Sequence, residues 1–189
     1  MVRPPAARQA LLDAVRAELV ESASSTDLST LVSRAGVSTG AVYHHFGSKV
    51  GLLAAVYGAF FDGSERAVTA AGQSAGTWTA RMHDRIRAMV EYYFTDPLGP
   101  VVLARSTEHS AITELEAAYL ARAAAGVAAN LRAPDAVLPP DLDLDLTAAY
   151  LVGGLRRALA QQLAHTPRPT VEATTAALWR LTTATLSQP

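Results

Sequence analysis

The chain has 189 residues, half of them hydrophobic, with 16 basic and 17 acidic side chains and no cysteine. This length is sufficient for one large or two small globular domains. The lack of cysteine excludes disulfides and thiolate zinc sites, and no apolar run reaches the length of a membrane span. Because Met1 to Pro5 contain no apolar signal core, we expect a cytoplasmic protein.

Alanine is abundant and strand-forming runs are rare, which favours an all-α fold. Hydrophobic periodicity predicts about nine helices. The first covers 6–22, with Leu12, Val15 and Leu19 on one face. Two short helices lie within 26–48. The expected later helices cover 50–71, 78–95, 100–106, 108–131, 144–164 and 170–187.

The two short helices have the chemistry of a helix-turn-helix. Thr26 and Asp27 are potential N-caps. Apolar residues then recur at helical spacing: Leu28, Leu31, Val32 and Ala35. Gly36 can adopt the left-handed backbone that ends a helix, and Ser38 can cap the next one. A tight turn containing glycine between two short helices is the signature of this motif, whose second helix enters the major groove of DNA.

The second short helix is suited to close approach to DNA. Its small residues let the backbone come near phosphates, and its polar and aromatic side chains can contact phosphates or bases. Ser48 is expected to cap the following helix. Lys49, the only lysine of the chain, then lies in its first turn, where a cation opposes the helix dipole and a phosphate contact would explain it. The predicted DNA-binding residues are Thr39, Gly40, Ala41, Tyr43, His44 and Lys49.

The aromatic run 43–46 also has a purely structural interpretation, as a half-buried cluster. We expect Phe46 to be core and His45 to be a structural hydrogen-bonding residue. Neighbouring histidines on a helix point about 100° apart, so no metal site is predicted there.

These motifs resemble the DNA-binding domain of TetR-family transcriptional regulators. The resemblance covers about the first 55 residues. It rests on Thr26, Leu31, Ala35 to Ser38, Gly40, Tyr43, His45, Phe46, Ser48, Lys49, Leu52 and Leu53. The family has Ala where Val32 stands, and Thr or Ser where Ala41 stands. The resemblance implies that Thr39, Ala41, Tyr43 and His44 read DNA and that Lys49 holds a phosphate.

The resemblance also implies two domains, which we place at 1–52 for DNA binding and 53–189 for ligand binding and dimerisation. Residues 1–52 carry a net charge of +1 and the remainder −2. A head with so little positive charge predicts modest affinity for DNA, so we expect two heads to act together.

The middle helices contain the richest mixture of aromatic and polar side chains, as in many small-molecule sites. The family resemblance implies an effector pocket here, although most of these residues would be core in any helical bundle. The candidate pocket residues are Trp78, His83, Met89, Tyr92, Tyr93, Arg105, His109 and Tyr119. The alternating acids 141–145 resemble a calcium loop, but the required Gly and Glu are absent, which favours helix capping.

The last two helices are expected to form the dimer surface. The helix at 144–164 is apolar around most of its circumference, which predicts burial on two sides, and the resemblance implies a four-helix bundle shared with a second copy. The predicted interface residues are Tyr150, Leu151, Gly154, Leu155, Ala158, Leu178 and Leu181.

The sequence therefore predicts a homodimeric, ligand-responsive repressor of a pseudo-palindromic operator, with an unknown small-molecule effector and no cofactor. One alternative is a similar regulator gated by a partner protein. Another is a small helical metal-dependent enzyme using His83, His109 and nearby acids, but no metal-binding or nucleophile motif supports catalysis.

Overall fold

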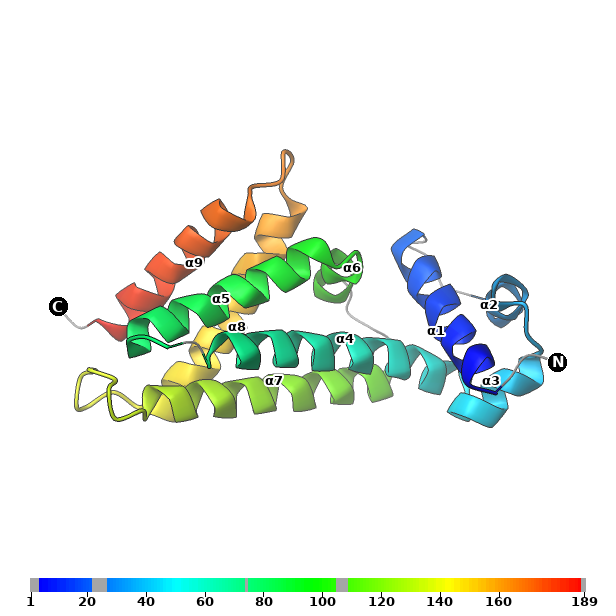
Figure 1. Cartoon of the computed structure of the whole chain (residues 1–189), viewed down its shortest axis with the longest axis horizontal. Helices are drawn as coiled ribbons and strands as arrows, with labels where there is room; N and C mark the ends of the chain where they lie inside the picture. The colour runs from blue at the N-terminus through cyan, green and yellow to red at the C-terminus, as the bar shows by residue number, and fades with distance from the viewer. Residues whose placement is uncertain (1–3, 22–26, 74, 105–108, 188–189) are drawn as a thin grey trace. The chain divides into compact units, whose positions relative to one another are not determined.

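The computed structural model describes residues 4–21, 27–73, 75–104 and 109–187. Within these ranges the chain forms nine α-helices and no strand (Figure 1). In chain order they are α1 (Pro4–Glu21), α2 (Leu28–Ala35), α3 (Thr39–Phe46), α4 (Lys49–Ala71), α5 (Trp78–Thr95), α6 (Leu98–Ala104), α7 (Ser110–Leu131), α8 (Leu144–Ala164) and α9 (Val171–Leu186). The predicted all-α fold is confirmed. Thr26 and Arg105 lie outside the described residues.

Most predicted helix limits hold within two residues, and α6 shows why they shift. The helix predicted at 100–106 instead begins at Leu98 and ends at Ala104. The Leu98 N–H donates to Asp96 Oδ1 at 2.9 Å, and the Gly99 N–H donates to the Asp96 carbonyl at 2.8 Å. Pro100 is tolerated because the first turn of a helix needs no N–H donor there.

Side-chain caps account for several other helix starts. Thr77 accepts a hydrogen bond from the Ala80 N–H at 3.2 Å at the start of α5. Asp143 accepts from the N–H groups of Asp145 and Leu146 at the start of α8. The predicted capping role of the acidic run is therefore confirmed for Asp143, and it accounts for this carboxylate without a calcium ion.

The first compact unit comprises Met1–Phe61 and Arg105–Glu116. In it α1, α2 and α3 contact one another. The side chains of Leu11, Val15, Leu31 and Val42 are fully buried. These residues come from all three helices, so burial of their apolar surface holds the three-helix head together.

The second compact unit comprises Asp62–Ala104 and Ala117–Pro189. In it α5 packs against α6 and α9, and α8 packs against the same two helices. The buried side chains include Ile86, Val90, Leu159 and Leu178. The predicted domain boundary after residue 52 falls inside α4, whereas the two units divide this helix after Phe61.

Candidate nucleic-acid interface and effector cavity

The turn between α2 and α3 has the geometry that its residues predict. Gly36 has φ 64° and ψ 33°, a left-handed conformation that costs glycine no steric strain. Its N–H donates to the Ser33 carbonyl, and the Val37 N–H donates to the Val32 carbonyl, both at 3.1 Å. This pair of hydrogen bonds ends α2 and starts the extended segment that leads into α3.

The two sides of α3 differ sharply in exposure. Val42 is completely buried, whereas Tyr43 is 57% exposed. Thr39, Gly40 and His44 are also exposed, and Ala41 is half-buried. The residues predicted to read DNA therefore share an accessible side of α3, while Val42 anchors the helix to the head.

Lys49 begins α4, directly after Ser48. The Ser48 hydroxyl accepts a hydrogen bond from the Gly51 N–H at 2.9 Å, so the predicted cap is confirmed. A hydrogen bond from the Ser29 hydroxyl lowers the pKa of Asp27, and the charge of Lys49 contributes a smaller lowering. The side chain of Lys49 is half-exposed, at the start of the helix that follows α3.

Ion pairing occupies one other cation of the head. Arg34 contacts Glu18 at 3.2 Å and Glu21 at 2.6 Å. These contacts tie α2 to α1. Two carboxylates neutralise the charge of Arg34, so Arg34 is poorly suited to bind a phosphate. The predicted phosphate contact of the head stays Lys49.

The prediction that Phe46 is core is corrected by the structure. Its ring is half-buried, and the guanidinium of Arg8 lies 5.4 Å from the ring centroid. A long cation from α1 thus lies over this aromatic ring at the end of α3. His45 lies between His44 and Phe46 with edge-on ring contacts. Among the described residues, no cluster of His, Cys, Asp or Glu suited to a metal ion is present.

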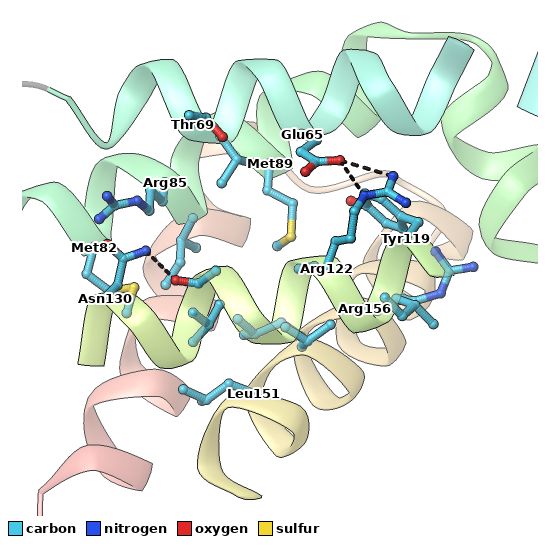
Figure 2. A pocket seen from close by; sticks show the side chains of 18 of the residues that line it. Glu65, Thr69, Met82, Arg85, Met89, Tyr119, Arg122, Asn130, Leu151 and Arg156 are labelled. Carbon is cyan, nitrogen blue, oxygen red and sulfur yellow. Dashed lines mark hydrogen bonds and ion pairs between the residues drawn. The ribbon is translucent and has the colours of Figure 1, made fainter. Parts of the chain in front are cut away.

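The second unit encloses a cavity of about 470 Å³, a size typical of small-molecule sites. Figure 2 shows it between α4, α5, α7 and α8. The lining is mainly apolar and includes Met82, Ile86, Met89, Leu120, Ala123, Val127, Leu151, Leu155 and Leu159. Its charged residues are Glu65, Arg85, Arg122 and Arg156.

Three of the predicted pocket residues line this cavity: Met89, Tyr93 and Tyr119. Four others lie elsewhere, and Arg105 is outside the described residues. Trp78 donates its indole N–H to the Asn130 carbonyl at 2.7 Å, and the His83 ring packs edge-on against Trp179 at 5.4 Å. Neither of them lines the cavity.

Two further pocket candidates are also placed away from the cavity. Tyr92 presents its hydroxyl to Gly63, where a Cβ atom would lie only 2.1 Å from that oxygen. His109 belongs to the first unit. The predicted pocket set thus mixed residues from the two sides of α5.

Sequence reasoning missed the three cavity arginines. Arg85 occupies an otherwise apolar side of α5, with Met82, Ile86 and Met89 at spacings of three and four residues. A single arginine on an otherwise apolar side of a helix was the signal that could have identified Arg85 as a cavity residue. Arg122 lies in an alanine-rich stretch and Arg156 directly precedes a second arginine, so neither sequence context offered a comparable signal.

Polar contacts hold one end of the cavity in place. Arg122 donates to Glu65 Oε2 from two nitrogens at 3.1 and 3.2 Å (Figure 2). The hydroxyls of Ser64 and Tyr119 lie 3.2 Å apart, and burial raises the pKa of the adjacent Tyr93 well above its ordinary value. Tyr93 therefore stays neutral at physiological pH.

The predicted dimer surface is divided between exposed and buried positions. Tyr150 and Leu181 are more than half exposed, Gly154 is exposed, and Leu155 and Ala158 are half-buried. The remaining two residues, Leu151 and Leu178, are buried inside the protomer. The side chains of these two residues pack within their own unit, so the proposed interface depends on the other five.

Within the described ranges, no helix combines the length and the apolarity needed to cross a membrane. Residues 11–56 match the profile of the family described as "Bacterial regulatory proteins, tetR family". No curated protein matches the chain.

Solved structures share the fold across almost the whole chain. A TetR-family transcription regulator from Shewanella sp. PV-4 is 19% identical with a TM-score of 0.77, covering 97% of this chain and 99% of its own. One from Syntrophomonas wolfei is 12% identical with a TM-score of 0.81, covering 99% and 98%. The regulator FadR from Bacillus subtilis, solved with stearoyl-CoA, is 15% identical with a TM-score of 0.71, covering 95% and 99%.

Proposed function

We propose that this chain, which belongs to the TetR family of DNA-binding transcription regulators, is a ligand-responsive repressor that binds a pseudo-palindromic operator as a homodimer. The observation that carries the proposal is the exposed side of α3. Tyr43 and His44 are accessible there, while Val42 on the opposite side is fully buried. A helix of this kind can enter a major groove without disturbing its own core.

The start of α3 and the start of α4 have complementary roles in this proposal. Thr39 and Gly40 are exposed in the first turn of α3, where unpaired N–H groups and the helix dipole attract phosphate. Lys49 supplies a positive charge that can contact a second phosphate. Tyr43 offers a hydroxyl for phosphate and a ring for sugar or a thymine methyl group.

The exposed residues Tyr150 and Gly154 on α8 and Leu181 on α9 support a homodimer. A Cβ atom built on Gly153 or Gly154 would meet nothing within 4 Å, so the surface is open to a second helix. Leu146 is exposed on the same helix. An exposed apolar patch of this kind is typical of association surfaces, and a two-fold interface would present two recognition helices to two half-sites.

The cavity supports control by a small molecule rather than by a partner protein. In the FadR structure from Bacillus subtilis the same fold contains stearoyl-CoA. Here α4 runs without interruption from Lys49 to Ala71, and it contributes Glu65, Val68 and Thr69 to the cavity. A ligand that binds one position of α4 better than another shifts the population of DNA-binding conformations.

The test is an electrophoretic mobility shift assay with duplexes that the wild-type protein selects from a random pool. Tyr43→Ala is expected to lose specific binding while its circular dichroism spectrum and its molar mass stay unchanged. Tyr43→Phe keeps the ring and separates the contribution of the hydroxyl. Undiminished specific binding by Tyr43→Ala would contradict the proposal.

A further inference from the structure

The cavity carries an excess of positive charge. Three arginines and one glutamate contribute charged groups to its lining. Arg122 is engaged by Glu65, and Arg156 donates to the Val102 carbonyl at 3.4 Å. The remaining arginine, Arg85, lies at the opposite end of the cavity from Arg122 and Arg156 (Figure 2).

Arg85 is held by the backbone and not by a carboxylate. Its Nη2 donates to the Gly72 carbonyl at 3.2 Å. Its Nη1 is buried and has no hydrogen-bond partner among the described residues. Burial lowers the pKa of Arg85, and the nearby charge of Arg81 lowers it further. A partly buried cation without a matching anion is unfavourable, so an anion beside the Arg85 guanidinium would be stabilising.

Gly72 creates the space that Arg85 occupies. A Cβ atom at residue 72 would lie 2.1 Å from Arg85 Nε and 2.2 Å from its Cζ. Any larger side chain would therefore push the guanidinium out of its position. The glycine and the arginine form one unit, in which a small residue at the end of α4 positions a charge at the cavity.

An apolar stretch separates Arg85 from the other polar end. Along α5, Ile86 and Met89 lie between Arg85 and Tyr93 and line the cavity. Eight residues of α-helix correspond to about 12 Å. Residues of α7 and α8 cover the same stretch: Ala123, Val127, Leu151 and Leu155.

The far end is polar, and most of its polar groups contact one another. Arg156 also has a buried Nη1 atom without a hydrogen-bond partner among the described residues, but its Nη2 donates to the Val102 carbonyl. Ser64 and Tyr119 share a hydrogen bond, and the buried Tyr93 hydroxyl interacts with both. A neutral hydroxyl cluster is a poorer site for an anion than a guanidinium, and the carboxylate of Glu65 at this end opposes a second anion, whereas the lining beside Arg85 holds no carboxylate. The cavity thus has an apolar middle and arginines at both ends. Among the described residues, a carboxylate accompanies the arginines only at the end of Glu65, Arg122 and Arg156, whereas Arg85 has no carboxylate beside it in the lining.

We propose that the effector is an elongated amphipathic carboxylate, whose anionic group binds the Arg85 guanidinium and whose unbranched apolar chain lies along Ile86 and Met89 toward Tyr93. This inference rests on the proposed function, because it names the chemistry of the ligand that the regulator recognises. Methionine suits such a chain, since its flexible thioether adapts to the shape of an apolar ligand.

The test measures the binding of decanoate and of decanol to the full chain by isothermal titration calorimetry. Decanol has the same chain without the charge. We expect decanoate to bind at least about tenfold more tightly than decanol, as for a charge-assisted hydrogen bond in a buried site. Arg85→Gln should remove that preference and leave decanol binding within about twofold of wild type.

Two further variants make this result specific. Arg87→Gln is the matched control, because Arg87 is an exposed arginine on the same helix and does not line the cavity. It should keep the wild-type preference for decanoate. Gly72→Ala should reduce the preference as Arg85→Gln does. The readout is the ratio of the dissociation constants for decanol and decanoate. A general loss of protein stability would weaken the binding of both ligands alike and leave this ratio unchanged.

Equal binding of decanoate and decanol, binding of neither, or an unchanged ratio in Arg85→Gln would overturn the inference. DNA-binding measurements distinguish failure of the proposed anionic site from failure of the proposal that a small molecule controls DNA binding. If decanol releases the protein from DNA as effectively as decanoate, ligand control stands and the anionic site does not. If decanoate binds through Arg85 but leaves DNA affinity unchanged, the anionic site stands and ligand control does not.

Discussion

Val42 and Tyr43 are neighbours on α3, and one is completely buried while the other is 57% exposed. Successive residues of a helix point about 100° apart, so a single step along the chain separates the anchor of the head from its outer surface. This relationship allows stability and DNA recognition to be changed independently.

Val42→Ala is expected to reduce the free energy of unfolding by about 2 kcal/mol, because it removes buried methyl groups and leaves a small cavity. Tyr43→Ala should change the same quantity by less than about 0.5 kcal/mol, as for an exposed substitution. Urea unfolding measured by circular dichroism gives both values. A large loss of stability in Tyr43→Ala would show that its ring supports the fold and does not merely lie on the surface.

Lys49→Ala should weaken specific and non-specific DNA binding alike, because a phosphate contact carries no sequence information. The slope of log affinity against log salt concentration should become shallower by about one for each head. Fluorescence anisotropy over a series of salt concentrations measures this slope. Arg87→Ala, which removes an exposed cation from the second unit, should leave the slope unchanged.

Leu181→Asp should dissociate the proposed dimer, because it introduces a charge into an apolar association surface. Sedimentation velocity of the variant is expected to show a folded monomer. Val137→Asp is the matched control, since Val137 is an exposed aliphatic residue outside α8 and α9. A Leu181→Asp variant that stays dimeric would place the interface on another surface.

The contact between Arg81 and Asp135 should make stability depend on pH in the acid range. Two hydrogen bonds of 2.9 Å join Arg81 Nη2 to the Asp135 carboxylate and lower the pKa of Asp135 below its usual 3.8. A lowered folded-state pKa means that the stabilisation is complete above the usual value and is lost as the pH falls through the folded one.

The corresponding experiment compares thermal unfolding of the wild type and Asp135→Asn between pH 7 and pH 2. The variant should lose the part of the acid dependence that lies below about pH 3.8. Arg81→Gln should do the same, and the double variant should add little more. Parallel pH curves for the wild type and Asp135→Asn would show that the contact contributes nothing measurable.

Local chemistry made the head predictable from sequence. Gly36 ends α2 because glycine adopts a positive φ without strain, and Ser48 caps α4 with its hydroxyl. Both effects act between residues close in the chain. The periodicity of Leu28, Leu31, Val32 and Ala35 likewise indicated the apolar side of α2, on which Leu31 is fully buried.

The cavity depended on interactions between distant residues and was only partly foreseen. Tyr92 and Tyr93 are adjacent and chemically identical, yet only Tyr93 lines the cavity. Their sequence context cannot distinguish them, because which side of α5 faces the cavity depends on where the other helices pack. The packing of the other helices likewise decides that Leu151 is buried in the core, although an apolar residue at this position was equally compatible with an exposed interface.

The sequence by itself determined the helical class, the helix-turn-helix and the residues on the outer side of α3, since each follows from backbone preferences and short-range hydrogen bonds. Only the tertiary structure decided that Arg85, held against Gly72 at the end of α4, lies at the cavity without a carboxylate partner among the described residues. The physical reason is that the burial of a charge is set by what surrounds it in space, and those neighbours come from separate parts of the chain.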